Sequence, residues 1–539
     1  MDATLVASPP PQQPTIQKRA PATNSEAVVR QPTSWRMPPR AIAWRLFFTC
    51  WIVYALHFAT DVVREHYPAI ALGDHFSFRL DEYAGLHPDL FEKPGYGWHI
   101  GNNPGVSILA AIPYALARPV IDPLVASVKE RRAASGLTDP PEFMTPRPNA
   151  RKFFAESWRR GLDIKLGLAA LVTHALFMVP SSALGVVFMF FALRAVFASD
   201  RRALWLSLLY AFGTPVFFRT GFLNHNLMLG HIAFMGFLAI WNPLRSPRVS
   251  SERRYLLAGL AGGTALLFDY SGVIFLLGIF GYGAVKRWRE SSPRDAVRHS
   301  AMYVVGTLPP VVVLLFYQWR SFGNAFFPGQ HWMPPVRWIE LGYQGYGGPQ
   351  LELLYALAFD HRFGLFMAAP VLLLALACPW ANRGERRVLP ALEELVCLAL
   401  FIVLWMFFSG SNYTRLQWNT GVRYMTPILP FIFLPAAIVL VRMRLRAVYV
   451  ISLFSFILAW CMAMNREVWR PLGVLEPIAR ILVGGFELPA LTTLSRMPGM
   501  FGTYVGDGVS PLPLFILAGA VIYLIWWGRL GSAGARGAR

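Results

Sequence analysis

The chain has 539 residues, of which 55% are hydrophobic and only 15% are charged. Because a soluble domain carries about 25% charged residues, this composition excludes an ordinary soluble enzyme. The 18 Trp and 40 Phe exclude disorder as the main state. The net charge of +20 does not indicate nucleic-acid binding, because the basic residues stand in short clusters between apolar runs, as on the cytoplasmic side of membrane proteins.

The first 40 residues are rich in Pro, Ala, Thr and Arg and lack the apolar core of a signal peptide. We expect 1–40 to be a disordered cytoplasmic tail, 41–530 to be one transmembrane domain, and 531–539 to be a cytoplasmic C-terminal tail. Apolar runs then predict an all-α polytopic membrane protein with a bundle of about 12 transmembrane helices. The expected spans are 42–60, 164–193, 203–221, 226–243, 255–268, 271–285, 301–318, 363–379, 390–409, 424–441, 447–463 and 511–528.

Arg and Lys clusters fall on alternate connections between these runs, which places both termini in the cytoplasm. The runs 255–268 and 271–285 are short for two spans, and a hairpin that meets near Asp269 is the alternative. The run 104–121 has the length of a span, but its three prolines each remove helix hydrogen bonding. We therefore expect an interfacial helix there, on the outer face. The extracytoplasmic loops are then 61–163, 319–362, 410–423 and 464–510.

Acidic residues and histidines gather between residues 61 and 103, which hold seven carboxylates and four of the eleven histidines. Most loop carboxylates are simply solvated, but a general base needs one within hydrogen-bond reach of a substrate hydroxyl. Asp81 and Glu82 are adjacent and project in different directions, so one can face a pocket. No metal site is predicted, because no spacing such as HExxH is present. The four cysteines form no CxxC pair and indicate no disulfide framework.

Three later stretches follow this acidic pair in the chain. They are RSFGNAFFPG (320–329), HRFGLFMAAPVLLL (361–374) and TGVRYMTPILPFIF (420–433). Together the four motifs match those of one enzyme family in order and approximate spacing, over about residues 42–441. The chain resembles the membrane glycosyltransferases of the GT-C fold, and within them the bacterial protein-mannosyltransferase-like and aminoarabinose-transferase-like enzymes. Ala369 stands where that family commonly has Ser, and Val422 where it commonly has Pro. Residues 1–40 and 122–163 have no counterpart.

The resemblance implies a GT-C-like bundle in a bacterial plasma (inner) membrane, with the active site on the extracytoplasmic side. The enzyme is then a hexosyl- or pentosyltransferase that moves a sugar from a polyprenyl-phosphate donor to a hydroxyl of a lipid, glycan or protein acceptor. No cofactor is required and no nucleic acid is a partner; dependence on a divalent metal stays open. The resemblance assigns Asp81 as the base, with Glu82 beside it. One carboxylate suffices for inversion, whereas retention needs a second one about 5 Å away.

A departing phosphate needs cations that neutralise its charge. We expect donor phosphate contacts from Arg423, Arg362, Arg337 and His331, for which interfacial anchoring is the alternative role. The substrate cavity is expected to include the four residues His225, Asn224, Asp269 and Tyr83. Asn224 is also suited to cap a helix. Asp269 is an acid at membrane depth, and such acids are either paired with a neighbouring helix or functional.

Two other functions remain open on the sequence alone. A polymerase or ligase of lipid-linked glycans would also use an outer-loop catalytic group and a lipid-linked donor. A transporter or lipid flippase would account for the short apolar halves around Asp269, since transporters use discontinuous helices. Against the transporter, the two halves of the chain show no repeat, and transport does not need a long acid-rich outer loop.

Overall fold

The computed structural model describes residues 37–145, 148–245, 247–335, 342, 345–415, 422–465, 472–497 and 509–527. The chain divides into Met1–Pro38 and one helical unit, Pro39–Arg539. Of the tail predicted over 1–40, residues 1–36 lie outside the described residues, and a helix already begins at Pro39. The tail predicted over 531–539 lies outside them as well.

The unit is predominantly helical. Its helices are α1 (Pro39–Leu56), α2 (His66–His75), α3 (Gly105–Ala134), α4 (Pro148–Arg159), α5 (Asp163–Thr173), α6 (Val179–Phe197), α7 (Asp200–Phe212), α8 (Val216–Thr220), α9 (His225–Trp241), α10 (Ser251–Phe268), α11 (Gly272–Glu290), α12 (Pro293–Phe322), α13 (Leu351–Phe359), α14 (Leu365–Ala368), α15 (Cys378–Ala381), α16 (Ala391–Ser409), α17 (Leu429–Arg442), α18 (Leu445–Met464), α19 (Leu475–Gly484), α20 (Pro489–Ser495) and α21 (Leu512–Trp527). Short 3₁₀ segments are Asp81–Tyr83, Gly329–Trp332, Pro370–Ala377, Gly384–Arg386, Asn412–Arg415 and Thr426–Ile428. The strands β1 (Leu90–Lys93) and β2 (Gly97–Ile100) form an antiparallel hairpin.

Within the described ranges, five helices are long and apolar enough to cross a membrane. They are α3, the continuous run Asp163–Phe197, α12, α16 and α18, and the bent pair α19–α20 passes the same test as a sixth. The chain is therefore an all-α protein of the membrane type. Each of the twelve predicted ranges contains helix, but several are short or broken, so the count of twelve spans is not confirmed.

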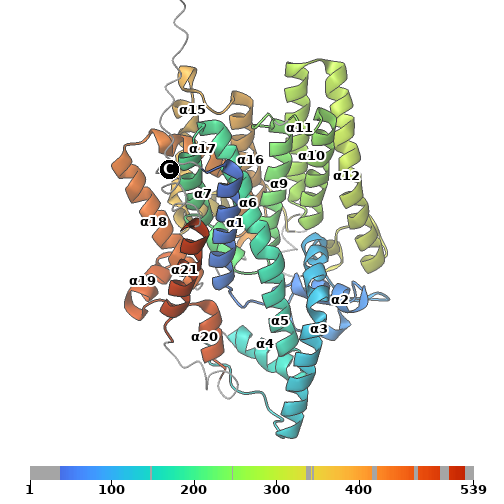
Figure 1. Cartoon of the computed structure of the whole chain (residues 1–539). Helices are drawn as coiled ribbons and strands as arrows, with labels where there is room; N and C mark the ends of the chain where they lie inside the picture. The colour runs from blue at the N-terminus through green and yellow to red at the C-terminus, as the bar shows by residue number, and fades with distance from the viewer. Residues whose placement is uncertain are drawn as a thin grey trace, which may run out of the picture. The chain divides into compact units, whose positions relative to one another are not determined.

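The bundle around α10 shows why these runs pack closely. α10 contacts α9, α11 and α12 (Figure 1), and its first turn is capped by the Ser250 hydroxyl, which accepts the Arg253 N–H. A Cβ on Gly259 would overlap the carbonyl oxygen of Tyr303 on α12. Small residues let helix backbones approach in this way inside membranes. The short runs on either side of Asp269 are thus parts of two full helices that form a hairpin.

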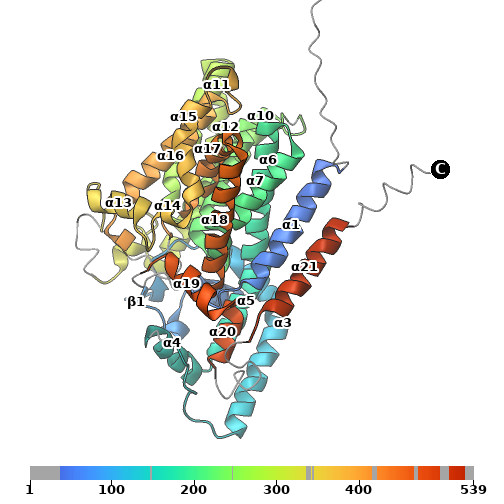
Figure 2. The same cartoon turned by 90° about the vertical axis from the view of Figure 1, so that its left-hand side faces the viewer.

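The helix predicted over 104–121 is longer than expected. α3 continues through Pro113, Pro119 and Pro123 to Ala134, because its contacts with α2 and α5 support it where proline removes hydrogen bonds. It extends beyond the ends of α9 and α10 (Figure 1). At the other side of the bundle, α21 lies beside α1 (Figure 2).

Candidate functional site

Three ionisable side chains from distant parts of the chain meet at one end of the helix bundle. Nδ1 of His225 lies 2.5 Å from Oε1 of Glu65, and Nε2 of the same ring lies 3.5 Å from Oδ2 of Asp269. Glu65 precedes α2, His225 begins α9, and Asp269 follows α10. We call these three residues the acid–imidazole cluster. The imidazole bridges two carboxylates, one on each ring nitrogen.

Glu65 is the buried member of the cluster, with 4% of its side chain exposed. Its backbone carbonyl accepts a hydrogen bond of 2.8 Å from the Ser107 hydroxyl on α3, which fixes the start of α2. Burial by itself raises the pKa of a carboxyl group, but His225 and Arg64 outweigh burial and hold the pKa of Glu65 well below its usual range. Glu65 is therefore an ionised group suited to orient the imidazole, and it is closed to solvent.

Asp269 is the open member of the cluster, with 26% of its side chain exposed. Its Oδ1 accepts hydrogen bonds from the backbone N–H and the hydroxyl of Ser271, at 2.8 and 2.6 Å. These two bonds fix the carboxylate and turn Oδ2 toward His225. Because the His225 contact is long, Oδ2 keeps lone pairs available for a hydroxyl donor.

Cations and a third acid surround the cluster. Nη1 of Arg64 lies 3.1 Å from Oδ2 of Asp89, while its Nε lies 3.3 Å from Glu65. Burial opposes ionisation of Asp89, but Arg64 and His87 lower its pKa, and the charge of Arg423 adds to that effect. The charge of Arg423 therefore acts on Asp89, the acid that pairs with Arg64. The site combines carboxylates held ionised with guanidinium groups that could meet a phosphate.

Two amides beside His225 carry buried donors. Asn224 caps α9, since its Oδ1 accepts the Leu227 N–H at 3.1 Å. In the described part of the chain, Nδ2 of Asn224 and Nδ2 of Asn226 have no hydrogen-bond partner. Buried donors are usually paired, so a polar ligand group at this place would satisfy them.

The structure places the predicted acidic pair at the surface. Asp81 is half-exposed, pairs with Arg79 at 2.8 Å, and accepts the backbone N–H of Trp98 at 2.8 Å. Glu82 is also half-exposed, and its nearest cation is Lys165 at 3.8 Å. Asp81 therefore fastens the Asp81–Tyr83 turn to the hairpin, and its role as the base stays a prediction.

Tyr83, predicted to line the substrate cavity, is buried in a core formed by α2, α3 and α5. Its ring lies 5.3 Å from that of Tyr67. His225, Asn224 and Asp269 were predicted for the same cavity, and these three come together at the acid–imidazole cluster. The sequence interpretation thus grouped three residues that are neighbours with one that packs in a hydrophobic core.

The four residues predicted to contact the donor phosphate do not lie together in the structure. The charge of Arg423 acts on Asp89, and its guanidinium lies 5.0 Å from the ring centre of Tyr424. Arg362 is half-exposed and makes a two-pronged ion pair with Asp360. His331 is exposed and stacks on the ring of Phe327 at 4.6 Å. Arg337 lies outside the described residues.

Glu65 is the site residue that the sequence interpretation missed. Glu65 is one of the seven acids between residues 61 and 103, but the sequence pattern favours the adjacent pair at Asp81. A usable signal was present, since Glu65 follows the first apolar run closely and stands between Arg64 and His66.

The search for metal-binding groups found no set of three His, Cys, Asp or Glu side chains with suitable geometry among the described residues. In comparisons with protein-family models, curated proteins and solved structures, nothing matched this chain. Its function is therefore argued from the chemistry of the acid–imidazole cluster and its surroundings.

Proposed function

We propose that the protein is a membrane glycosyltransferase that moves a sugar from a polyprenyl-phosphate donor to an acceptor hydroxyl. The observation that carries the proposal is the acid–imidazole cluster, in which a buried ionised acid orients an imidazole beside a second, open carboxylate. General-base chemistry needs such a carboxylate. Arg64, which contacts Glu65, and Arg423, whose charge acts on Asp89, supply in this proposal the positive charge that a departing phosphate needs. A purely structural ion pair would not require an open carboxylate.

Asp269 is the base in this proposal, because its side chain is the most exposed of the three in the cluster. The acceptor O–H gives its proton to Oδ2, and the oxygen attacks the anomeric carbon. The bond between that carbon and the phosphate oxygen breaks, and its electron pair leaves with the phosphate. Glu65 and His225 are positioning residues. Glu65 orients the imidazole, and the imidazole directs its Nε2 toward Oδ2 of Asp269. A single displacement of this kind inverts the anomeric centre.

The placement of the site in the membrane follows from the basic connections. α9 runs from His225 to a connection that holds Arg245 and Arg248, and α10, with Arg253 in its first turn, returns from there to Asp269. The cluster therefore lies at the bundle end opposite these arginines. Under the positive-inside rule that end is extracytoplasmic. Twelve spans, a GT-C-like bundle and a bacterial inner membrane are parts of the same proposal.

The test measures free polyprenyl phosphate released from a panel of polyprenyl-phosphate sugars, with candidate acceptors supplied to purified protein. We expect Asp269→Asn to slow release by about 10²–10⁴-fold, because Asn keeps an oxygen for the Ser271 bonds and loses only the base. Asp122→Asn is the matched control, since Asp122 is a half-exposed acid on α3 paired with Arg118. It should release at the wild-type rate.

The alternatives give different outcomes in the same assay. If Asp81→Asn abolishes release of polyprenyl phosphate while Asp269→Asn releases it at the wild-type rate, the base is Asp81 and not Asp269. Release that yields a growing glycan chain would indicate the polymerase or ligase. If no donor in the panel releases free polyprenyl phosphate but a substrate is moved across the membrane, the transferase is refuted and a transporter or flippase is favoured.

A further inference from the structure

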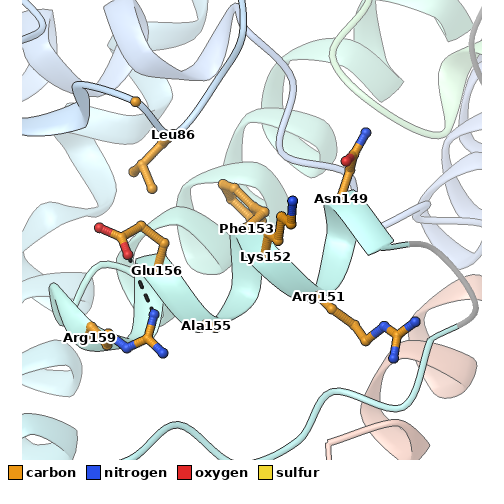
Figure 3. Close-up of a pocket in the computed structure, with 9 residues that line it drawn as sticks. Leu86, Asn149, Arg151, Lys152, Phe153, Ala155, Glu156 and Arg159 are labelled. Carbon is orange, nitrogen blue, oxygen red and sulfur yellow. Dashed lines mark ion pairs between the residues drawn. The ribbon is translucent and has the colours of Figure 1, made fainter.

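A pocket separate from the acid–imidazole cluster lies between α4 and the loop that follows the Asp81–Tyr83 turn. Its volume is about 610 Å³, within the range of about 300–1,000 Å³ for small-molecule sites. Leu86 faces α4 across the pocket, and Phe153 projects from α4 on the same side (Figure 3). Asn149 adds a side-chain amide at one end. The pocket thus offers an apolar floor with polar groups at its edge.

The charge around this pocket is strongly positive. Arg151, Lys152 and Arg159 line it together with one acid, Glu156. Glu156 is already neutralised, because Arg160 lies 2.7 Å and Arg159 3.6 Å from its carboxylate. A hydrogen bond from Arg160 is the main reason that the pKa of Glu156 is lowered.

Arg151 and Lys152 have no such partner among the described residues: neither has an ion pair or a hydrogen bond from its side chain there. Both side chains are exposed. They point to different sides of α4 (Figure 3), because neighbouring residues on a helix do not face each other. Each is a separate cation at the rim of the cavity that can hydrogen-bond the oxygens of an anion. The walls are fixed in place, because Arg160 also donates to the carbonyl oxygen of Ala84 at 2.8 Å.

We infer that the pocket lies outside the hydrocarbon, because the neighbouring helix is long and the cluster Arg194, Arg201 and Arg202 marks its other membrane boundary. The run Asp163–Phe197 has 35 residues, which corresponds to about 52 Å at 1.5 Å per residue. This exceeds the hydrocarbon core of about 30 Å by some 20 Å. α4 ends at Arg159, just before this run begins, and it contacts α5. A ligand of the pocket is therefore met in water or among headgroups.

We propose that this pocket binds an acidic saccharide, a short sugar unit that carries a phosphate or a carboxylate. The anionic group meets Lys152, which lies on the side of α4 that also holds Asn149 and Phe153 (Figure 3). Asn149 bonds a sugar hydroxyl, the apolar face of a sugar ring rests on Phe153, and Arg151 adds positive charge at the rim. The wall segment continues from Leu86 to Asp89, which pairs with Arg64 of the reaction site. If the proposed transfer holds, this pocket binds the acceptor and limits it to acidic glycans.

The binding test uses the full chain in phosphatidylcholine nanodiscs, titrated with digalacturonate and with glucose 6-phosphate. Maltose is the uncharged comparison. We expect the acidic sugars to bind, maltose to bind at least tenfold more weakly, and Arg151→Gln/Lys152→Gln to weaken the acidic sugars at least tenfold. The matched control is Arg289→Gln/Arg294→Gln, which removes two exposed cations on α11 and α12 and should leave binding unchanged.

Several results would overturn this inference. Equal binding of maltose and the acidic sugars, or no binding at all, would remove the anion site. Undiminished binding by the Arg151/Lys152 double variant would place it elsewhere. Loss of sugar binding when phosphatidylglycerol replaces phosphatidylcholine would assign the pocket to lipid headgroups. Asp269→Asn should bind the sugars normally, so a failed transfer assay and a failed binding assay are separate outcomes.

Discussion

The pairing of Glu65 with His225 gives a prediction whose size follows from burial. A hydrogen bond to a charged group contributes about 1.5–3 kcal/mol to stability, and the Glu65 carboxylate accepts one from His225. The side chains are only 4% and 8% exposed, so water screens them little, while desolvation offsets part of the attraction. In a double-mutant cycle of Glu65→Gln and His225→Asn, we expect a coupling of about 2–3 kcal/mol in the free energy of unfolding.

The assay is reversible unfolding in mixed micelles, where added sodium dodecyl sulfate denatures the helices and circular dichroism reports the transition. The control is a second cycle on Arg79→Gln and Asp81→Asn. That pair has a comparable separation of 2.8 Å, but its side chains are 62% and 47% exposed. Its coupling should be below about 1 kcal/mol. Equal coupling in the two cycles would refute the argument that burial makes the cluster strong.

Three further predictions concern pH, the donor phosphate and helix packing. The lowered pKa of Glu65 stabilises the fold above the pKa of the unfolded chain, about 4.3, and this contribution disappears as pH falls through the folded value. Acid titrations of unfolding should therefore be steeper for wild type than for Glu65→Gln, and parallel curves would contradict this. Arg423→Gln should raise the KM for the donor by about 10–100-fold, the equivalent of one charge-assisted hydrogen bond, whereas Arg362→Gln should leave it unchanged; the opposite ranking would move the phosphate site. Gly259→Ala should lower the free energy of unfolding by about 1–3 kcal/mol through overpacking, while Gly281→Ala, which meets no neighbour, should not; similar losses would show that close backbone approach is unimportant.

The membrane class and the positions of the helices could be read from the sequence, because long apolar runs and clustered arginines are local signals. Local signals also limit what the sequence can predict about where helices end or continue. Proline lowers helix stability at each position, yet α3 runs through three prolines because α2 and α5 hold it in place. Helix ends and breaks, such as the division of 203–221 into α7 and α8, depend on packing that no periodicity records.

The sequence by itself marked His225 and Asp269 as unusual, since polar groups between apolar runs are costly unless they are paired or used. Only the tertiary structure decided that Glu65 is their partner and that Asp81 instead holds a surface turn. The physical reason is that a side chain's burial and its neighbours depend on contacts between segments far apart in the chain. Glu65 and Asp81 are both acids of the same predicted loop, but only the fold removes Glu65 from water and leaves Asp81 exposed.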